Sequence, residues 1–270
     1  MKAWGSLDLV AALIQETARD AVLPRFRQLR SDEIEQKLAP DGKNDLVTVV
    51  DRDVEDRLTR ALTALVPAMV IGEETSHGSP ELLDLIHTDA PLWIVDPIDG
   101  TRNFAKGSDA FGIMVAWVVA GQAEAAWVLL PARQQMFMAQ LGAGAFMNGR
   151  PVRVPPREAG TRLSGNAHTR YLAPPLSDRI ARAVGDHFTV VPDLGCSAVE
   201  YTDVLQGRQD FTTYYRLLPW DHAAPALILT EAGGVVEHLD GQLYTARSPN
   251  QVTVVAGNRE VSATVRSHLR

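Results

Sequence analysis

The sequence predicts a layered fold of α+β or α/β type, in which helices cover the faces of sheets. Short apolar segments of strand length alternate along the chain with longer segments of helical periodicity. A strongly apolar stretch at 111–132 is interrupted by Gly121, Gln122 and Glu124. That interruption predicts two buried strands joined as a hairpin rather than a membrane helix, which needs about 20 continuous apolar residues.

The first half begins with an amphipathic helix over about residues 6–29, which Pro24 kinks or ends. Residues 31–45 are charged and contain a Pro-Asp-Gly turn, so they predict a loop. A helix with a regular apolar face ends before Pro67 and buries Val54, Leu58, Leu62 and Leu65. Strands are expected at 46–50, 70–71, 92–95, in the hairpin at 112–130, at 135–139 and after the turn in 142–152.

A Pro- and Arg-rich segment at 151–160 predicts a boundary between two halves. We expect an N-terminal α+β half, 1–150, and a C-terminal α/β half, 151–270. A helix over 221–232 ends at the Gly-Gly pair that follows it, and a short helix closes the chain. Strands of the second half are expected at 188–191, 211–215 and 252–255.

Composition narrows the possible partners. The formal net charge of -7 disfavours binding to nucleic acid or to anionic membranes, because both need a basic surface. An anionic substrate remains compatible with this charge if bound cations reverse the local sign. The single cysteine, Cys196, excludes an internal disulfide and predicts a reduced, buried thiol. No apolar run follows Met1, so we expect no signal peptide and a cytoplasmic protein.

The segment WIVDPIDGT carries the most specific chemical signal. A buried strand delivers Asp96 to its end, and Asp99 follows three residues later. Two carboxylates and the carbonyl of Ile98 then present hard, anionic oxygen to one point, which suits Mg²⁺. Gly100 and Thr101 begin a helix whose free N–H groups suit a phosphate. The structural alternative is a capped turn with a solvated Asp pair, and the surrounding Pro, Gly and Thr favour a site.

Other acidic residues follow strands or open helices in the same way. They are Asp51, the pair Glu73 and Glu74, and Asp221. Singly, Asp51 and Asp221 are typical of helix caps, and a Glu pair is typical of a solvated face. Sites in layered α/β proteins gather at strand ends, and several carboxylates in one cleft repel one another unless cations are bound.

These motifs together resemble the inositol monophosphatase family over nearly the whole chain. IGEET resembles the metal-binding Glu motif of the family, WIVDPIDGTRNF its first signature and PWDHAAPALILTEAGG its second, while DLVTVVD fits the pattern of the first half. The resemblance implies a layered αβαβα sandwich of the inositol monophosphatase and fructose bisphosphatase type. It also implies a homodimer, dependence on Mg²⁺, inhibition by lithium and hydrolysis of a small phosphate monoester.

The resemblance implies a metal-ligand set spread over both halves, with most ligands in the first. Glu73, Asp96 and the Ile98 carbonyl would hold one Mg²⁺. Asp96, Asp99 and Asp221 would hold a second. The resemblance also allows a third, more weakly bound ion near Glu73. Metal ions lower the pKa of bound water and stabilise a leaving alkoxide, so the chemistry needs no covalent enzyme intermediate.

The resemblance also implies the catalytic groups around these metals. Thr101, Asp51 and Glu73 would serve the attacking water, and the amides of Gly100 and Thr101 would bind the phosphate. His222 follows a metal-binding Asp, and it could act as an acid, cap a helix, pack against its neighbours or support that carboxylate. Lys43 could approach the water or the phosphate, although the family places its Lys at a longer spacing.

Substrate selection is less well defined. Inositol-type relatives carry a Glu where this chain has Tyr214, which disfavours inositol phosphate itself because a phenol cannot replace a carboxylate as a double acceptor. Arg216 could meet a second anionic group of the substrate or lie on the surface. Residues of the segment GCSAVEY, of TRNF and of the second signature are further candidates for the pocket: Gly195, Ser197, Glu200, Arg102 and Asp221.

The sequence therefore predicts a phosphomonoesterase acting on an inositol-phosphate-like metabolite or on a sugar or polyol phosphate. Histidinol phosphate or a 3'(2'),5'-bisphosphate nucleotide is an alternative substrate for the same chemistry. An interaction partner of the transcription machinery, with catalysis secondary, is an alternative of another class. The complete acidic set favours an enzyme, and the acidic net charge disfavours direct RNA binding.

Overall fold

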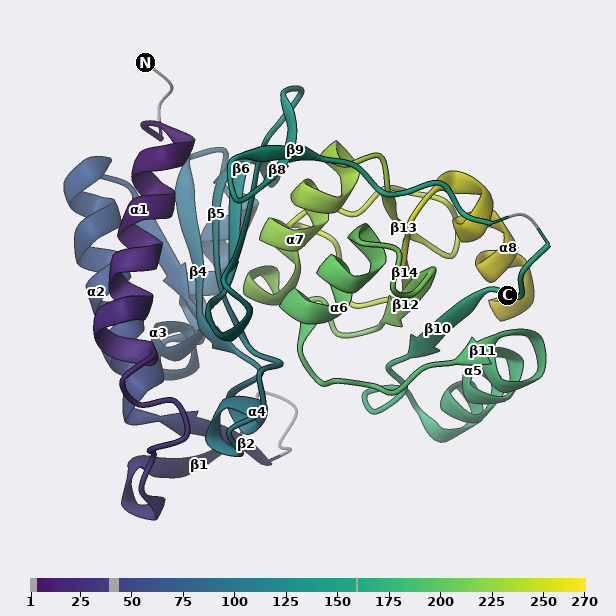
Figure 1. Cartoon of the computed structure of the whole chain (residues 1–270), viewed down its shortest axis with the longest axis horizontal. Helices are drawn as coiled ribbons and strands as arrows, with labels where there is room; N and C mark the ends of the chain where they lie inside the picture. Colours follow the sequence, from purple (N-terminus) through teal and green to yellow (C-terminus); the bar gives the residue numbers. More distant parts are fainter. Residues whose placement is uncertain (1–3, 39–43, 159) are drawn as a thin grey trace.

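The structure is a computed structural model that describes residues 4–38, 44–158 and 160–270. Within these ranges, layers of helix and sheet alternate across the molecule in the order αβαβα (Figure 1). Helices α1 and α2 form one outer layer, α6 and α7 the middle layer, and α5 and α8 the other outer layer. Their bounds are α1 Leu7–Thr17, α2 Val49–Leu65, α5 Pro174–His187, α6 Ser197–Leu205, α7 Pro219–Glu231 and α8 Arg259–Leu269. The predicted layered sandwich is confirmed.

The larger sheet of the described chain has seven strands in sequence order, β3 to β9. The pair β3 and β4 is parallel and every later pair is antiparallel. The strands are β3 Met69–Gly72, β4 Leu92–Asp99, β5 Gly112–Val119, β6 Gln122–Leu130, β7 Gln135–Gln140, β8 Gly144–Met147 and β9 Arg150–Val152. Central strands β5 and β6 are buried on both faces, which explains their continuous apolar sequence and confirms the predicted hairpin.

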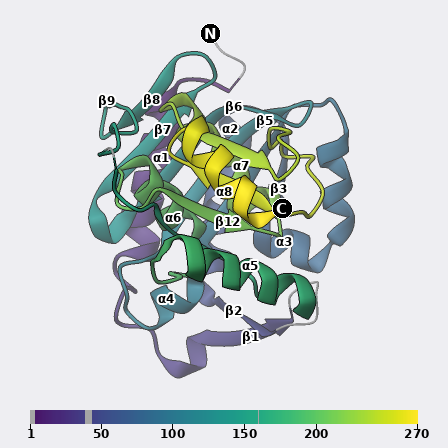
Figure 2. The same cartoon turned by 90° about the vertical axis from the view of Figure 1, so that its right-hand side faces the viewer.

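The second sheet is built from residues after 160. Among the described residues it has five strands in the order β11-β10-β12-β14-β13, and Figure 2 shows α5 and α8 in front of it. Its strands are β10 Ser164–Ala167, β11 Thr189–Val190, β12 Phe211–Tyr214, β13 Val235–His238 and β14 Thr253–Ala256. Sequence analysis missed β10, because SGNA is short and lacks alternating apolar residues.

Helix α7 lies between the sheets and packs against strands of both. Its residues from Pro219 to Leu229 are almost all buried, so it shows little amphipathic character. Pro219 occupies the first turn, where its missing N–H is tolerated. This placement brings the N-terminus of α7 to the end of β4. Since α6 and α7 pack onto both sheets, the boundary between halves at residue 150 stays a prediction.

Two segments near the N-terminus differ from expectation. The first helix is shorter than predicted, since α1 continues as a π-helical turn over Ala18–Val22 and ends before Pro24. The loop predicted for 31–45 is wrong, because β1, Ile34–Leu38, pairs with β2, Asn44–Thr48. The strand has no apolar alternation, so its pairing was not visible locally.

Short helices complete the frame of the site. They are α3 Glu73–Gly78, α4 Thr101–Ala105 and the 3₁₀ turns Ser31–Glu33, Pro80–His87 and Pro131–Arg133. The helix that follows β2 buries Val54, Leu58 and Leu62 as predicted, whereas Leu65 is only half-buried. In the part of the chain that the structure describes, no helix is both long and apolar enough to cross a membrane.

Candidate metal and active site

A cavity of about 520 Å³ opens where the end of β4 meets the N-termini of α3, α6 and α7. Strand ends and helix starts converge here because the middle helical layer packs onto both sheets. The cavity is lined by nearly all of the predicted site residues: Glu73, Asp96, Ile98, Asp99, Gly100, Thr101, Gly195, Ser197, Tyr214, Arg216 and Asp221. Arg102 and His222 also border it. Asp51 and Glu200 are fully buried and lie behind this lining.

Three carboxylates form the acidic floor of the cavity: Asp96, Asp99 and Asp221. One oxygen from each lies within 4.8 Å of the others, although the residues are up to 125 positions apart. A register irregularity in β4 between Asp96 and Asp99 lets both side chains reach the cavity. The third member, in the first turn of α7, is not an N-cap as predicted, because Leu218 holds that position.

Asp96 is the residue of the acidic floor whose ionised form is least favourable. Its side chain is 1% exposed, and neither carboxylate oxygen has a hydrogen-bond partner among the residues that the structure describes. Burial, followed by repulsion from Glu73, Asp99 and Asp221, raises the pKa of Asp96 well above its ordinary value. A buried carboxylate without donors is costly unless a cation is bound beside it.

Asp99 is held by the first turn of α6. Its Oδ2 accepts hydrogen bonds from the Ala198 amide at 2.6 Å, from Ser197 Oγ at 3.1 Å and from the Cys196 thiol at 3.1 Å. Burial raises the pKa of Asp99 to about 6, and these donors act in the opposite direction. Ser197 therefore orients a floor carboxylate, whereas its contact with substrate stays a prediction. The Cys196 thiol is buried and unpaired with another cysteine, as expected.

Asp51 and Thr101 form a buried pair beside the acidic floor. Thr101 Oγ1 lies 3.0 Å from Asp51 Oδ1 and 2.9 Å from the Ile98 carbonyl oxygen. Thr48 donates its amide to Asp51 Oδ2 at 2.9 Å and its hydroxyl to the same oxygen. Asp51 thus also completes the capping box of α2, which agrees with its interpretation as a helix-capping residue. Burial raises the pKa of Asp51 to about 7.

Glu73 opens α3 at another edge of the cavity, and Lys37 binds it. The Lys37 ammonium lies 2.9 Å from Glu73 and also pairs with Glu74. Sequence analysis missed Lys37 because it assigned its strand to a loop. Lys43, which was considered instead, lies outside the described residues.

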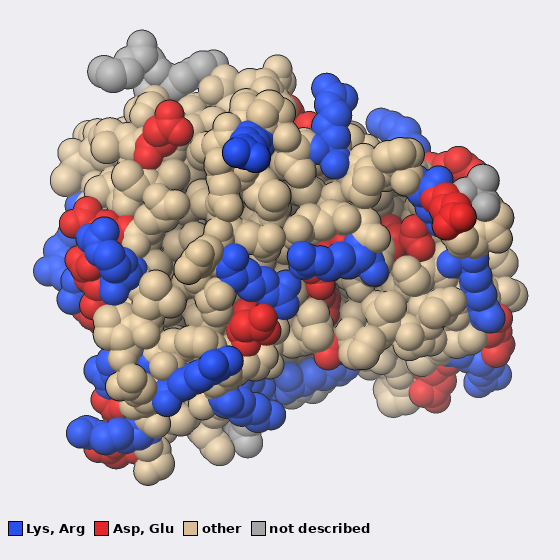
Figure 3. All heavy atoms as spheres, viewed as in Figure 1, with Lys and Arg blue, Asp and Glu red and all other residues tan. Residues whose placement is uncertain are grey.

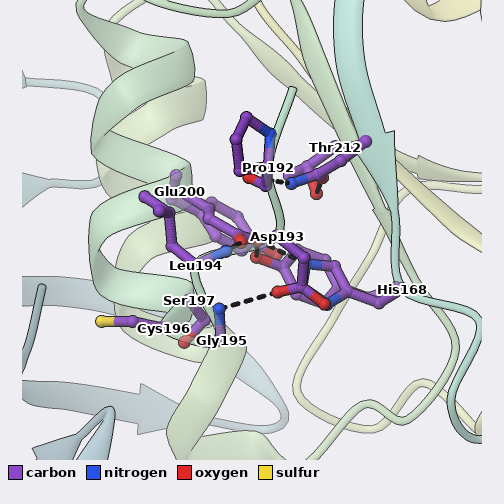
Figure 4. Close-up of polar contacts among 12 residues, drawn as sticks. His168, Pro192, Asp193, Leu194, Gly195, Cys196, Ser197, Glu200 and Thr212 are labelled. Carbon is purple, nitrogen blue, oxygen red and sulfur yellow. Dashed lines mark hydrogen bonds and ion pairs between the residues drawn. The ribbon is translucent and has the colours of Figure 1, made fainter. Parts of the chain in front are cut away.

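The lining of the cavity also includes a charged histidine that was not predicted from the sequence. His168 lies between two carboxylates, with Nδ1 3.3 Å from Asp193 and Nε2 bonded to the buried Glu200 (Figure 4). Burial opposes its charge, but the bonds to both carboxylates outweigh that cost and raise the pKa of His168 to about 10. The carboxylates hold different ring nitrogens, so this cluster is an ion-pair triad rather than a metal site. No short-range motif joins these three residues.

Tyr214 belongs to the same network. Its phenol donates to Glu200 at 2.6 Å, and its ring stacks on His168 with 4.5 Å between centroids. The Leu194 amide donates to the other Glu200 oxygen at 2.9 Å. Glu200 is therefore an internal acceptor, and its predicted place in the pocket lining is wrong because it has no exposed surface.

His222 is neutral and engaged on both ring nitrogens. Tyr201 binds Nδ1 at 3.0 Å, and Nε2 lies 3.0 Å from the carbonyl oxygen of Arg216. Burial lowers the pKa of His222 to about 3. The carbonyl is an acceptor only, so Nε2 carries the proton and Nδ1 accepts from the tyrosine. Of the roles considered for it, packing fits and general acid does not.

The donor set fits Mg²⁺. The acidic floor, Glu73 and the Ile98 carbonyl offer hard oxygen ligands, and no sulfur or imidazole ligand competes among them. The Ile98 carbonyl oxygen lies 2.9 Å from Thr101 Oγ1 and has two lone pairs, so one lone pair is open to a cation whichever acceptor the hydroxyl faces. Above all, a cation beside Asp96 would satisfy its two buried oxygens, which have no partner among the described residues.

Comparison with known proteins identifies the family. The model of the inositol monophosphatase family matches residues 6–270. The chain is 32% identical over 264 residues to the Nus factor SuhB of Pseudomonas aeruginosa, covering 93% of this chain and 94% of that protein. It is 31% identical to a fructose-1,6-bisphosphatase/inositol-1-monophosphatase of Thermotoga maritima, covering 82% of this chain and 81% of that relative.

A solved structure agrees with these alignments. An IMPase of Thermotoga maritima superposes with a TM-score of 0.78 at 25% identity, over 97% of this chain and 96% of that chain. The aligned region includes every strand and helix that borders the cavity. Sequence, fold and acidic floor lead to the same assignment. The chain belongs to the inositol monophosphatase family of metal-dependent phosphatases.

Proposed function

We propose that this protein is a Mg²⁺-dependent phosphomonoesterase that hydrolyses a small phosphorylated metabolite. One observation carries the proposal: Asp96 buries two unpartnered carboxylate oxygens within reach of Asp99 and Asp221. Such an arrangement is unfavourable without cations and favourable with them. Family membership supports phosphate ester hydrolysis as the reaction.

Five residues would hold the metals. Glu73, Asp96 and the Ile98 carbonyl would bind one ion, and Asp96, Asp99 and Asp221 a second, with a third ion near Glu73 as a further possibility for the working state. When bound, Mg²⁺ supplies Lewis-acid chemistry: it makes water acidic enough to attack near neutral pH and stabilises negative charge on the leaving oxygen.

Thr101 and Asp51 would orient the nucleophilic water. Thr101 lines the cavity, and its Oγ1 lies 3.0 Å from Asp51 Oδ1. A hydroxyl that gives its one proton to Asp51 keeps lone pairs that can accept a hydrogen bond from water. The raised pKa of Asp51, about 7, lets this carboxylate take up a proton near neutral pH. Glu73, at the facing edge of the cavity, would act on the same water.

The phosphate would bind at the turn after β4. Gly100 has φ +80° there, and a Cβ would lie 2.8 Å from the Ala110 carbonyl oxygen, so glycine is needed. Asn103 and Phe104 close the following turn by donating to the Gly100 carbonyl. The amides of Gly100 and Thr101 precede that turn and are offered to phosphate oxygens.

The substrate would be a sugar or polyol phosphate rather than inositol phosphate itself. Tyr214 donates its only phenolic proton to Glu200, and it cannot accept two hydroxyls as a carboxylate does. Histidinol phosphate and bisphosphate nucleotides remain alternative substrates for the same residues. Lithium sensitivity, a homodimeric state and a cytoplasmic location are further parts of this proposal.

A panel of phosphate esters tests the proposal through release of inorganic phosphate. Activity should require Mg²⁺, disappear with a chelator and fall when lithium is added. The panel includes inositol 1-phosphate, glycerol 2-phosphate, fructose 1,6-bisphosphate, histidinol phosphate and adenosine 3',5'-bisphosphate. A strong preference for inositol 1-phosphate would contradict the interpretation of Tyr214. Light scattering after size exclusion would measure the oligomeric state.

A second candidate function follows from the similarity to a Nus factor. By this proposal the chain also binds a protein of the transcription machinery. The net charge is -7, and on the face drawn in Figure 3 acidic side chains are interspersed with basic ones, which favours a protein partner over RNA. Affinity purification of the tagged protein should then recover transcription proteins. An active phosphatase that recovers none of them would count against this function.

A further inference from the structure

We infer that the substrate carries a second anionic group, a carboxylate or a second phosphate, which binds at a cationic rim of the cavity that also holds the acidic floor. The cationic rim is formed by His168, Arg170 and Arg216, which all line the cavity. This inference rests on the proposed phosphatase function and adds a substrate class to it. It predicts that the protein prefers phosphate esters with a second anionic group over polyol phosphates without one and over esters that carry an amine.

Arg216 provides the central observation. It follows β12, and its guanidinium carbon lies 4.1 Å from the centre of the Tyr171 ring. Its Nη1 is buried and finds no hydrogen-bond partner within the described part of the chain. A guanidinium donor that is removed from water and left unpaired is unfavourable, so this side chain gains free energy by turning to an oxyanion in the cavity that it lines.

The aromatic support suits that role. Stacking on Tyr171 holds the guanidinium by its face and leaves its N–H edge for a planar or tetrahedral oxyanion. Arg170 lies over the same ring at 5.4 Å, so two guanidinium groups share one aromatic platform. Paired N–H donors of this kind recognise carboxylate and phosphate with two parallel hydrogen bonds.

The local charge balance points the same way. His168, Asp193 and Glu200 together carry a net charge of -1, so Arg216, whose Nη1 has no hydrogen-bond partner among the described residues, is the group of the rim that can hold an anion. Tyr214 adds no negative charge there, because it is a neutral phenol that donates to Glu200. A second anion is therefore attracted to this end of the cavity, whereas an amine or imidazolium is repelled.

Two pairs of esters test the inference on the unmutated protein. 3-Phosphoglycerate and glycerol 3-phosphate differ only by a carboxylate in place of a hydroxymethyl group. Fructose 1,6-bisphosphate and fructose 6-phosphate differ by a second phosphate. We expect kcat/KM to be at least about tenfold higher for the doubly anionic member of one pair, mainly through a lower KM. The pair with the larger ratio identifies the anion as carboxylate or phosphate.

The substitution Arg216→Gln then assigns the effect to this residue. The ratio of kcat/KM between paired esters should fall at least about fivefold, whereas Arg182→Gln, an exposed arginine of α5, should leave the ratio unchanged. Arg216→Lys keeps the charge without the fork and should give an intermediate ratio. A ratio within twofold of one for both pairs in the unmutated protein, or a ratio unaffected by Arg216→Gln, overturns the inference.

The experiment separates this inference from the function on which it rests. If paired esters are hydrolysed equally well, the phosphatase proposal stands and the rim proposal fails. If no ester releases phosphate with Mg²⁺, the phosphatase proposal fails, and calorimetric binding of the same pairs with Mg²⁺ still decides. Tighter binding of the doubly anionic member supports the rim, and equal affinity overturns it. A preference for histidinol phosphate over all doubly anionic esters would also overturn it.

Discussion

The acidic floor and the cationic rim line the same cavity, yet their charges are balanced in different ways. Asp96 of the floor has no donor among the described residues, and burial and its acidic neighbours oppose its ionised form. At the rim, the charge of His168 is more than compensated by the two carboxylates of Asp193 and Glu200. A buried charge that is paired with other side chains therefore indicates a structural residue of the cavity wall. A buried charge without a partner indicates a place where a ligand binds.

Within the rim, Arg216 differs from His168 in whether its charged group has a partner inside the protein. Its neighbour His168 is satisfied within the protein, but its own Nη1 is not. By our proposals, the floor binds cations and the rim binds an anion. The cavity should therefore favour a substrate whose phosphoryl group lies at the metals and whose second anionic group lies at Arg216. The following changes test each side of this comparison, beginning with the largest effect.

Replacing Asp96 with Asn should lower kcat by more than about 10³-fold, because it removes the charge of a carboxylate that both proposed metals share as a ligand. The metal-free variant should melt at a higher temperature than the unmutated protein, since a buried and repelled carboxylate is gone. Phosphate release and thermal melts with a chelator measure both effects. Asp178→Asn, an exposed change on α5, is the control and should alter neither.

Replacing Thr101 with Ala should lower kcat by about 10²-fold, because the hydroxyl between Asp51 and the proposed water is lost. Thr101→Ser keeps the hydroxyl and should recover most of the rate. Both variants should fold, since Thr48 still donates to the buried carboxylate. Equal rates for the Ala and Ser variants would leave Thr101 with only its place at the start of α4.

Replacing His168 with Gln should destabilise the protein by about 3 kcal/mol near pH 6, because buried Glu200 loses its counter-charge. The pKa of His168 is raised from 6.5 to about 10, so its contribution is full below pH 6.5 and disappears as pH rises toward 10. The gap in unfolding free energy between variant and unmutated protein should therefore narrow over that window. His87→Gln, an exposed histidine, should give no such pH-dependent gap.

When metal is removed, the stability contributed by the acidic floor and by the adjacent Asp51 should depend on pH over a different range. Burial raises the pKa of Asp51 to about 7 and that of Asp99 to about 6, from 3.8 in an unfolded chain. Between about pH 4 and 7 the native state then binds more protons, so its stability falls as pH rises. Thermal melts with a chelator should show this fall, and millimolar Mg²⁺ should suppress it by binding the ionised carboxylates. A metal-free melting temperature that rises over this window would contradict the proposed burial of charge.

The two regions also differ in how far the sequence could predict them. The floor was predicted because Asp96 and Asp99 belong to one contiguous motif at a strand end, and Asp221 opens a recognisable helix. His168 could not be predicted, because its partners Asp193 and Glu200 are 25 and 32 positions away and only the packing of α6 onto the second sheet unites them.

Fold prediction followed the same physical division. The central hairpin of β5 and β6 was predicted because burial on both faces leaves a continuous apolar sequence. The polar strand β1 was not, because its stability comes from pairing with β2 rather than from its own residues. Lys37 was lost with it, and so was the ion pair that Lys37 makes with Glu73.

The smallest predicted effect comes from Tyr214→Phe at the junction of rim and core. The change removes the 2.6 Å hydrogen bond to Glu200 but keeps the stacking on His168, and Glu200 retains its other donors. Stability should fall by about 1 kcal/mol, which is about 2–4 °C in melting temperature. Tyr215→Phe is the matched control, since its hydroxyl makes no hydrogen bond to the described residues. Equal melting temperatures for the two variants would show that His168 and the Leu194 amide hold Glu200 without help from Tyr214.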